Sequence, residues 1–232
     1  VWNENKVKYM VFAGFIIIAC ICCNHSCKKL LSVDMGFWDY ILWNLRGMKV
    51  IRKNEYIVPN AYWVFIQLYL AVVVGVYPVK DLHMAGQQIL LKSGNRKAWW
   101  FGKVIWNILS VLGFYLVLYL SVTAVSIVTG GFKAAQPEVA AFLLENQKIE
   151  NAGTELYMYA MAVPVIVSLA IAVTQMMIAV VFQPPMGYIW VCAVIAAGIF
   201  IYSPYSLGNY LMLMRTPVLL HGSILNTLWA VV

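Results

Sequence analysis

The stretch KDLHMAGQQILLKSGNRKAWWFGK, residues 80–103, is a polar island between two long apolar segments. It contains five basic residues and a single acidic one, Asp81. Asp81 is suited to begin a helix, because its carboxylate can accept hydrogen bonds from the free amides of the first turn. Gly94 is suited to end one, because glycine readily adopts the left-handed conformation of a helix terminus. The sequence therefore predicts a short helix over residues 81–92, followed by a loop that returns the chain to an apolar segment.

The predicted helix has one apolar side. The spacing of its apolar and small residues places four of them together: Leu82, Gly86, Ile89 and Leu90. Trp99 and Trp100 follow the basic cluster, and such amphipathic rings favour the interface between membrane and water. We expect the helix to lie beneath a membrane, with the two tryptophans at the interface. The alternative is a solvated loop that is basic only because cytoplasmic loops are generally positive.

Composition indicates a polytopic membrane protein. The 232 residues are 63% hydrophobic and only 11% charged, whereas an average soluble domain is about 25% charged. So few charged residues provide too little polar surface to cover a water-soluble protein of this size. The net charge of +7 could indicate nucleic acid binding. Because the basic residues cluster beside apolar segments, however, they favour anionic lipid headgroups and membrane orientation, and we expect no nucleic-acid partner.

Apolar segments of membrane-spanning length recur along the whole chain, each helix needing about 20 residues. We predict an all-α fold in which residues 1–232 form a single transmembrane domain. Pro184 and Pro185 divide the longest uncharged segment, because prolines interrupt helices, so two spans should meet there in a tight hairpin. The six predicted spans are residues 9–27, 56–79, 104–132, 156–182, 186–202 and 216–232.

The charge of the loops predicts their orientation. The basic loop 80–103 should be cytoplasmic, and the loop 133–155, which has four glutamates and two lysines, should lie outside. Both termini then fall in the cytoplasm. Residues 28–55 should lie outside although they carry six basic residues against three acidic ones. Their amphipathic run FWDYILWNL is expected either to lie flat on the outer surface or to dip into the bilayer.

The cysteine-rich run CICCNHSC, residues 20–27, suggests three interpretations. It resembles a metal cluster in density, but no familiar ligand pair occurs elsewhere in the chain. A disulfide at the outer end of the first predicted span is a second interpretation. Ordinary packing is the third and the one we favour, because cysteine behaves as a small apolar residue in membranes. We therefore predict no metal site.

Catalytic and nucleotide-binding motifs do not occur in the sequence. It contains neither the GxxxxGK[ST] phosphate loop nor the HExxH zinc motif. The predicted spans contain no Asp, Glu, Lys or Arg, whereas ion-driven carriers generally use ionisable groups at membrane depth. These observations favour a passive translocation pathway that is powered from outside this chain, with no enzymatic activity of its own. An ion-coupled transporter or channel and a membrane-embedded lipid-modifying enzyme are the alternatives.

Three stretches resemble the permease subunits of ABC-2-type exporters. They are FWDYILWNLRG (37–47), IVPNAYWVFIQLYL (57–70) and the loop 77–103 with its pattern D-x-x-x-x-G-Q-Q-x-L-x-x-S-x-x-R-x-x-WW. Within that class, the chain is most similar to the membrane subunits that export phenol-soluble modulins and antimicrobial peptides from Gram-positive bacteria. The resemblance extends over most of the chain.

The resemblance implies a complete transport complex. It implies six spans of the type V exporter kind, a dimer of permeases and separate cytoplasmic ATPase subunits that bind ATP and Mg²⁺, with no cofactor in this chain. A homodimer is favoured over a heterodimer, and the setting would be a bacterial plasma membrane. The substrate would be an amphipathic peptide of toxin, bacteriocin or modulin type. Residues 81–92 would be the coupling helix that docks on the ATPase, and the implied coupling residues are Asp81, Leu82, Gly86, Ile89, Leu90, Lys92 and Arg96.

Overall fold

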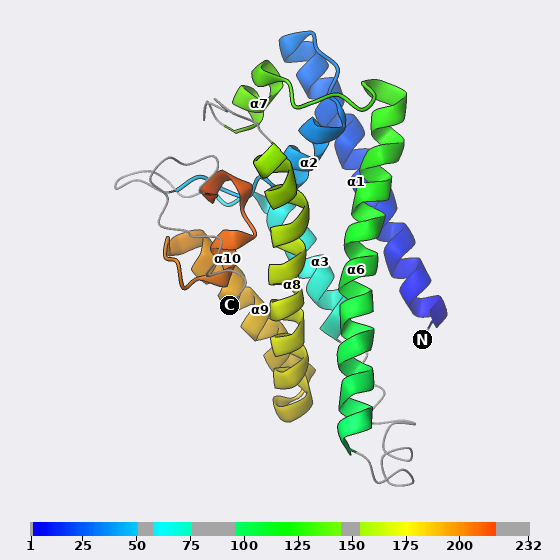
Figure 1. The fold of residues 1–232 in the computed structure, drawn as a ribbon, viewed down its shortest axis with the longest axis vertical. Coiled ribbons are helices and arrows are strands. Elements are labelled where there is room, and N and C mark those ends of the chain that lie inside the picture. The colour runs from blue at the N-terminus through cyan, green and yellow to red at the C-terminus, as the bar shows by residue number, and fades with distance from the viewer. Residues whose placement is uncertain (1, 51–57, 76–95, 145–153, 217–232) are drawn as a thin grey trace.

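The computed structural model describes residues 2–50, 58–75, 96–144 and 154–216, and these ranges are entirely without strands. The all-α prediction is thereby confirmed. Long helices pack lengthwise into a bundle, and shorter helices cover one of its ends (Figure 1). The elements are α1 (Trp2–Leu31), α2 (Phe37–Leu45), α3 (Ala61–Gly75), α6 (Arg96–Thr129), α7 (Pro137–Leu143), α8 (Thr154–Phe182), α9 (Pro184–Phe200), α10 (Leu207–Tyr210) and a 3₁₀ turn, η2 (Leu213–Arg215).

Three helices of the described residues are long and apolar enough to cross a membrane. The candidate spans, by length and composition, are Lys6–Leu31 of α1, Lys97–Thr129 of α6 and Leu156–Phe182 of α8. The shorter helices α3 and α9 are also apolar. The second predicted span, residues 56–79, extends beyond α3 on both sides into residues outside the described ranges, and nearly all of the sixth, 216–232, also lies outside them. Six spans therefore remain a prediction.

Helix α6 begins earlier than the sequence predicted. The third span was expected to start at residue 104, but α6 starts at Arg96 and includes both Trp99 and Trp100. The residues of this first part, RKAWWFGK, are mostly compatible with a helix, and the one glycine, Gly102, is tolerated at a cost of about 1 kcal/mol. The basic loop is therefore shorter than predicted, because its last eight residues are helical.

A single residue, Gln183, joins α8 to α9. Its φ angle of 83° turns the chain sharply, and two prolines occupy the first turn of α9. Proline is well suited to that position, since its missing amide would have no intrahelical partner there. Gly187 then lets α9 approach α8 closely, because a Cβ at this residue would lie 3.0 Å from the carbonyl oxygen of Gln175. The structure thus has the tight hairpin that the prolines predict.

The start of α1, the end of α3, the start of α6 and the α8–α9 turn all lie toward the same end of the bundle (Figure 1). Lys8 of α1 reaches the end of α3, where its Nζ donates to the carbonyl oxygen of Val72 (3.5 Å). Tyr69 of α3 donates in return to the carbonyl oxygen of Lys8 (2.8 Å). Loop charge predicts that this end faces the cytoplasm. That orientation stays a prediction, as does the side of the C-terminus, which lies outside the described residues.

Helix α2 is buried inside the opposite end rather than lying flat on a surface. Seven of its nine residues are buried, and it packs against α6, α7 and α8. Asp39 of α2 fixes its start by accepting hydrogen bonds from the backbone amides of Gly36 (2.9 Å) and Gln136 (3.0 Å). Burial raises the pKa of Asp39, although these two amides oppose the shift. Of the two predicted arrangements, the flat surface helix was therefore wrong, because protein covers most of α2, whereas the dip into the bilayer stays a prediction.

Arg215 secures the segment that follows α9. This fully buried side chain donates to the carbonyl oxygens of Met48 (3.2 Å), Lys49 (3.2 Å) and Ile199 (3.0 Å), and also to that of Gly198. Gly198 and Ile199 belong to the last turn of α9, where carbonyl oxygens lack intrahelical partners and a cation is electrostatically favourable. One arginine thereby links the end of α9 to the chain that leads from α2.

Candidate functional site

Most of the predicted coupling residues lie outside the described residues: Asp81, Leu82, Gly86, Ile89, Leu90 and Lys92. Arg96 is the first residue of α6. Trp99 and Trp100 are half-buried on α6 with their ring centroids 6.4 Å apart, and the Nζ of Lys103 lies 5.7 Å from the centroid of the Trp99 ring. The structure therefore places the two predicted interface residues at the start of a long apolar helix.

The cysteines pack as free thiols. All five are described, and Cys20 and Cys27 are fully buried against the rest of the protein. The amide of Asn44 on α2 lies 3.6 Å from the Cys20 sulfur. None of the five cysteines is disulfide-bonded in this arrangement, and the disulfide interpretation stays an untested alternative. The described portion of the chain also contains no group of three metal-ligating side chains that could hold an ion.

Uncharged polar side chains line the contacts among α3, α6 and α8 inside the bundle. We call this set the interior polar seam, and each member is at most 5% exposed. Amides and hydroxyls are costly to bury in an apolar environment unless they form hydrogen bonds. Their joint burial therefore marks a polar region between three apolar helices. The members are Gln67 of α3, Asn107 and Tyr115 of α6, and Ser168 and Gln175 of α8.

Hydrogen bonds of the seam tie α6 firmly to α8. The Tyr115 hydroxyl lies 2.8 Å from the Ser168 hydroxyl and donates to the carbonyl oxygen of Pro164 at 3.2 Å. Two turns further along, Asn107 donates to the carbonyl oxygen of Ala172 (2.9 Å). Tyr119 adds a bond to the carbonyl oxygen of Met161 near the surface (3.1 Å). These contacts extend along several turns of both helices, so α6 and α8 form a well-connected pair.

Within the seam, α3 has fewer polar bonds to α8 than α6 has. Gln175 donates from Nε2 to the carbonyl oxygen of Ala71 (3.1 Å), close to the lower end of α3. Gly75 ends the helix there, and a Cβ at this position would lie 2.6 Å from the same Nε2 atom. One turn above Ala71, the Nε2 of Gln67 is buried and has no hydrogen-bond partner among the described residues. Asn107 Oδ1 on α6 is also buried without a partner among the described residues, so one amide atom on each side of the seam is unsatisfied.

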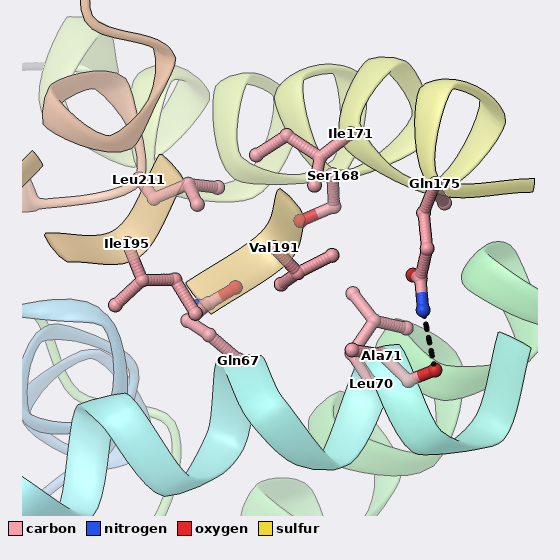
Figure 2. Close-up of a pocket in the computed structure, with 10 residues that line it drawn as sticks. Gln67, Leu70, Ala71, Ser168, Ile171, Gln175, Val191, Ile195 and Leu211 are labelled. Atoms are coloured by element: carbon pink, nitrogen blue, oxygen red, sulfur yellow. Dashed lines mark hydrogen bonds between the residues drawn. The ribbon is translucent and has the colours of Figure 1, made fainter. Parts of the chain in front are cut away.

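A small cavity lies at this point between α3, α8 and α9 (Figure 2). Its volume is about 20 Å³, close to that of a single water molecule measured in this way. Gln67, Ser168 and Gln175 supply its polar lining. Figure 2 shows the amide of Gln67 and the hydroxyl of Ser168 on either side of Val191. The remaining lining residues are apolar: Leu70, Ala71, Ile171, Ala172, Val191, Ile195 and Leu211.

The seam can bind polar atoms by hydrogen bonds without placing a charge at membrane depth. Sequence reasoning missed it because each residue stands alone within an apolar run. The spacing offered a signal: Ser168 and Gln175 are seven residues apart and so share one face of a helix. Asn107 and Tyr115 are similarly spaced on α6, which places both toward α8.

Comparisons of the chain with protein-family models, with curated proteins and with solved structures found no match. The fold and the seam therefore define the class directly: an all-helical protein with helices of membrane-spanning length and an uncharged polar interior.

Proposed function

We propose that this chain is the permease subunit of an ATP-driven exporter of the ABC-2 type, which moves amphipathic peptides across a membrane. One observation carries the proposal. Segment 76–95, which contains the predicted coupling helix, directly connects α3 to α6, and both helices contribute to the interior polar seam. Any force on that segment therefore acts on the two helices that border the seam.

The mechanism follows from this connection. A partner ATPase closes on ATP and moves the groove in which residues 81–92 sit. Helix α6 is hydrogen-bonded to α8 along several turns, whereas α3 has a single seam bond to α8, through Gln175. Rigid-body movements generally occur where contacts between packed elements can be exchanged. We therefore expect α3 to move relative to the α6–α8 pair, which would open a pathway along the seam.

The proposed complex contains two permease copies, favoured as a homodimer, and two cytoplasmic ATPase subunits that bind ATP and Mg²⁺. It would lie in a bacterial plasma membrane. The substrate class is an amphipathic peptide of toxin, bacteriocin or modulin type, because the seam is polar but uncharged and is surrounded by apolar side chains. Methionine-rich helices suit such variable cargo, since methionine adapts its shape.

The experiment is co-purification of the partner ATPase with permease variants in detergent. The ATPase to test is an ABC ATPase encoded by a gene neighbouring that of the permease, expressed together with it. Leu90→Asp should release the ATPase, because it places a charge on the apolar docking face, and desolvating a charge costs more than truncating a side chain. Lys92→Ala should retain it, since an exposed ion pair contributes about 0–1 kcal/mol.

The outcome is decisive if both variants are present in the membrane at wild-type levels. Equal retention of the ATPase by wild type and by Leu90→Asp would show that residues 81–92 do not dock on it. Failure of the wild-type chain itself to retain any ATPase would argue against the exporter class. An ion-coupled transporter would then be the first alternative to test, by transport in vesicles without ATP.

A further inference from the structure

The cavity between α3, α8 and α9 combines three properties. Buried residues line it, it has the volume of one water molecule, and Gln67 supplies a buried hydrogen-bond donor that lacks a well-formed partner among the described residues. Gln67 is only 5% exposed, so bulk solvent does not satisfy its amide. An unsatisfied buried amide destabilises a fold by about 1–3 kcal/mol.

We propose that this cavity is a binding site for one ordered water molecule, held chiefly by Gln67 and Ser168. The water accepts a hydrogen bond from Gln67 Nε2 and donates one to the Ser168 hydroxyl, which is 2% exposed and lines the same cavity. Buried waters typically form about three hydrogen bonds. The amide of Gln175, at the far side of the cavity, is placed to supply a third partner.

Neighbouring groups explain why the donor is not satisfied by protein alone. The Gln67 side chain approaches the Tyr115 hydroxyl, but the contact lacks the geometry of a full hydrogen bond, so Nε2 has no well-formed partner within the described residues. Tyr115 is instead engaged with Ser168 and with the carbonyl oxygen of Pro164. Gln175 likewise donates a hydrogen bond from its Nε2 to the carbonyl oxygen of Ala71. A bridging water completes the connection between α3 and the α6–α8 pair, and this site does not depend on the proposed transport function.

The first test is a double-mutant cycle measured by thermal unfolding of the full chain in detergent. Val191→Ile extends a lining side chain of α9 into the cavity and displaces the water. In the presence of Gln67 it should lower the melting temperature by a few degrees, because the amide then loses its partner. In the Gln67→Leu background, where no donor needs the water, it should lower the melting temperature by less than half as much.

A matched control measures the general effect of an added methylene group. Val122 on α6 is also fully buried but does not line the cavity, so Val122→Ile should have the same effect with and without Gln67→Leu. Equal effects of Val191→Ile in both backgrounds would overturn the water site.

The second test detects the water directly. Protein equilibrated in H₂¹⁸O is diluted into ordinary water and irradiated with X-rays at once, so that slowly exchanging water labels the side chains beside it. Val191 and Ile195 should acquire excess ¹⁸O relative to Ile189, which is exposed on the outside of α9. Gln67→Leu should abolish that excess. Labelling of Val191 and Ile195 no greater than that of Ile189 in the wild-type protein would overturn the proposal.

Discussion

Arg215 donates a hydrogen bond of 3.0 Å to the carbonyl oxygen of Ile199, at the end of α9. The same guanidinium contacts the Asn209 side chain at 2.6 Å and the backbone at residues 48 and 49. Residues 48–49, which lie far from Arg215 in the sequence, therefore converge with two nearer segments on one buried cation. The planar fork of arginine provides five donors in fixed directions, which suits a site composed mainly of carbonyl oxygens.

Arg215→Met should destabilise the protein by on the order of 3 kcal/mol, since several buried carbonyl oxygens lose a charged donor together. Arg215→Lys should recover only part of the loss, because an ammonium group cannot reproduce the fork. Thermal unfolding in detergent measures both variants. Lys97→Met, at an exposed position on α6, is the control and should change little. A melting temperature for Arg215→Met equal to that of the control would contradict the role assigned to Arg215.

Gly47 and Gly131 form a matched pair for backbone strain. Both have positive φ angles, of 67° and 74°, so alanine at either position should cost about 1–2 kcal/mol. At Gly47 a Cβ would also lie 2.5 Å from the Cβ of Met212, whereas nothing lies within 4 Å at Gly131. Gly47→Ala should therefore lower the melting temperature clearly more than Gly131→Ala. If the two variants unfold at the same temperature, the close packing of residues 47 and 212 is not as described.

Tyr115→Phe tests the link between α6 and α8. The change removes the hydroxyl that contacts Ser168 and Pro164, and interhelical hydrogen bonds in membrane proteins contribute about 0.6 kcal/mol on average. We expect a loss of about 1 kcal/mol, because the hydroxyl takes part in two contacts. Tyr119→Phe removes one bond nearer the surface and should cost less. A larger effect at Tyr119 would show that the interior polar seam is not the main link between these helices.

Asp39 and Asp34 should influence stability in opposite directions as the pH changes. Burial raises the pKa of Asp39 above its ordinary value of 3.8, so its stabilising contribution is present in full below 3.8 and is lost as the pH rises through the raised pKa. The hydrogen bond from Lys28 lowers the pKa of exposed Asp34, so its contribution is present above 3.8 and is lost as the pH falls through the lowered pKa.

Unfolding curves of Asp39→Asn and Asp34→Asn across the acidic range measure the two contributions. Relative to wild type, Asp39→Asn should lose more stability at the acidic end of the range than at neutral pH. Asp34→Asn should lose more at neutral pH than at the acidic end. The same pH trend in both variants would contradict the opposite shifts.

Cysteine labelling tests whether α6 crosses a membrane. The helix has 34 residues and, at 1.5 Å per residue, exceeds the thickness of the hydrocarbon core. In a background with all five native cysteines replaced by alanine, Lys97→Cys should react with an impermeant maleimide only after the cells are permeabilised. Glu138→Cys should react in intact cells. Reaction of both from one side would exclude a crossing, and a reversal would invert the predicted orientation.

The same background tests the interpretation of the cysteines. Because Cys20 and Cys27 are buried as packing residues, the cysteine-free chain should insert and retain most of its activity. Loss of bound zinc together with activity would restore the metal interpretation. Metal analysis of the purified wild-type protein is the accompanying measurement.

Local signals in the sequence predicted the features that depend on local chemistry. Pro184 and Pro185 predict the break between α8 and α9 because proline acts on the backbone of its own helix. The long uncharged segments likewise predict helices, because this signal also depends only on residues within the segment itself. The start of α6 was misplaced because basic residues indicate a loop in a membrane protein, although Arg96 and Lys97 are good helix formers.

Features that depend on distant contacts could not be predicted. Arg215 stands alone after an apolar run, and its partners come from residues 48–49, 198–199 and 209. The burial of α2 depends on α6, α7 and α8, which an amphipathic pattern does not specify. The seam lies between these cases: its residues could be recognised as polar exceptions, but only the packing of α3, α6 and α8 shows that they meet.

The single-residue connection at Gln183 has a consequence for biogenesis. One residue is too short a connection for α8 to enter lipid during synthesis while α9 remains in water. In a membrane, such a connection would favour entry of the two helices together, as a hairpin. Lengthening this turn with a flexible insert would uncouple them, and the resulting defect would arise during synthesis rather than in the finished protein.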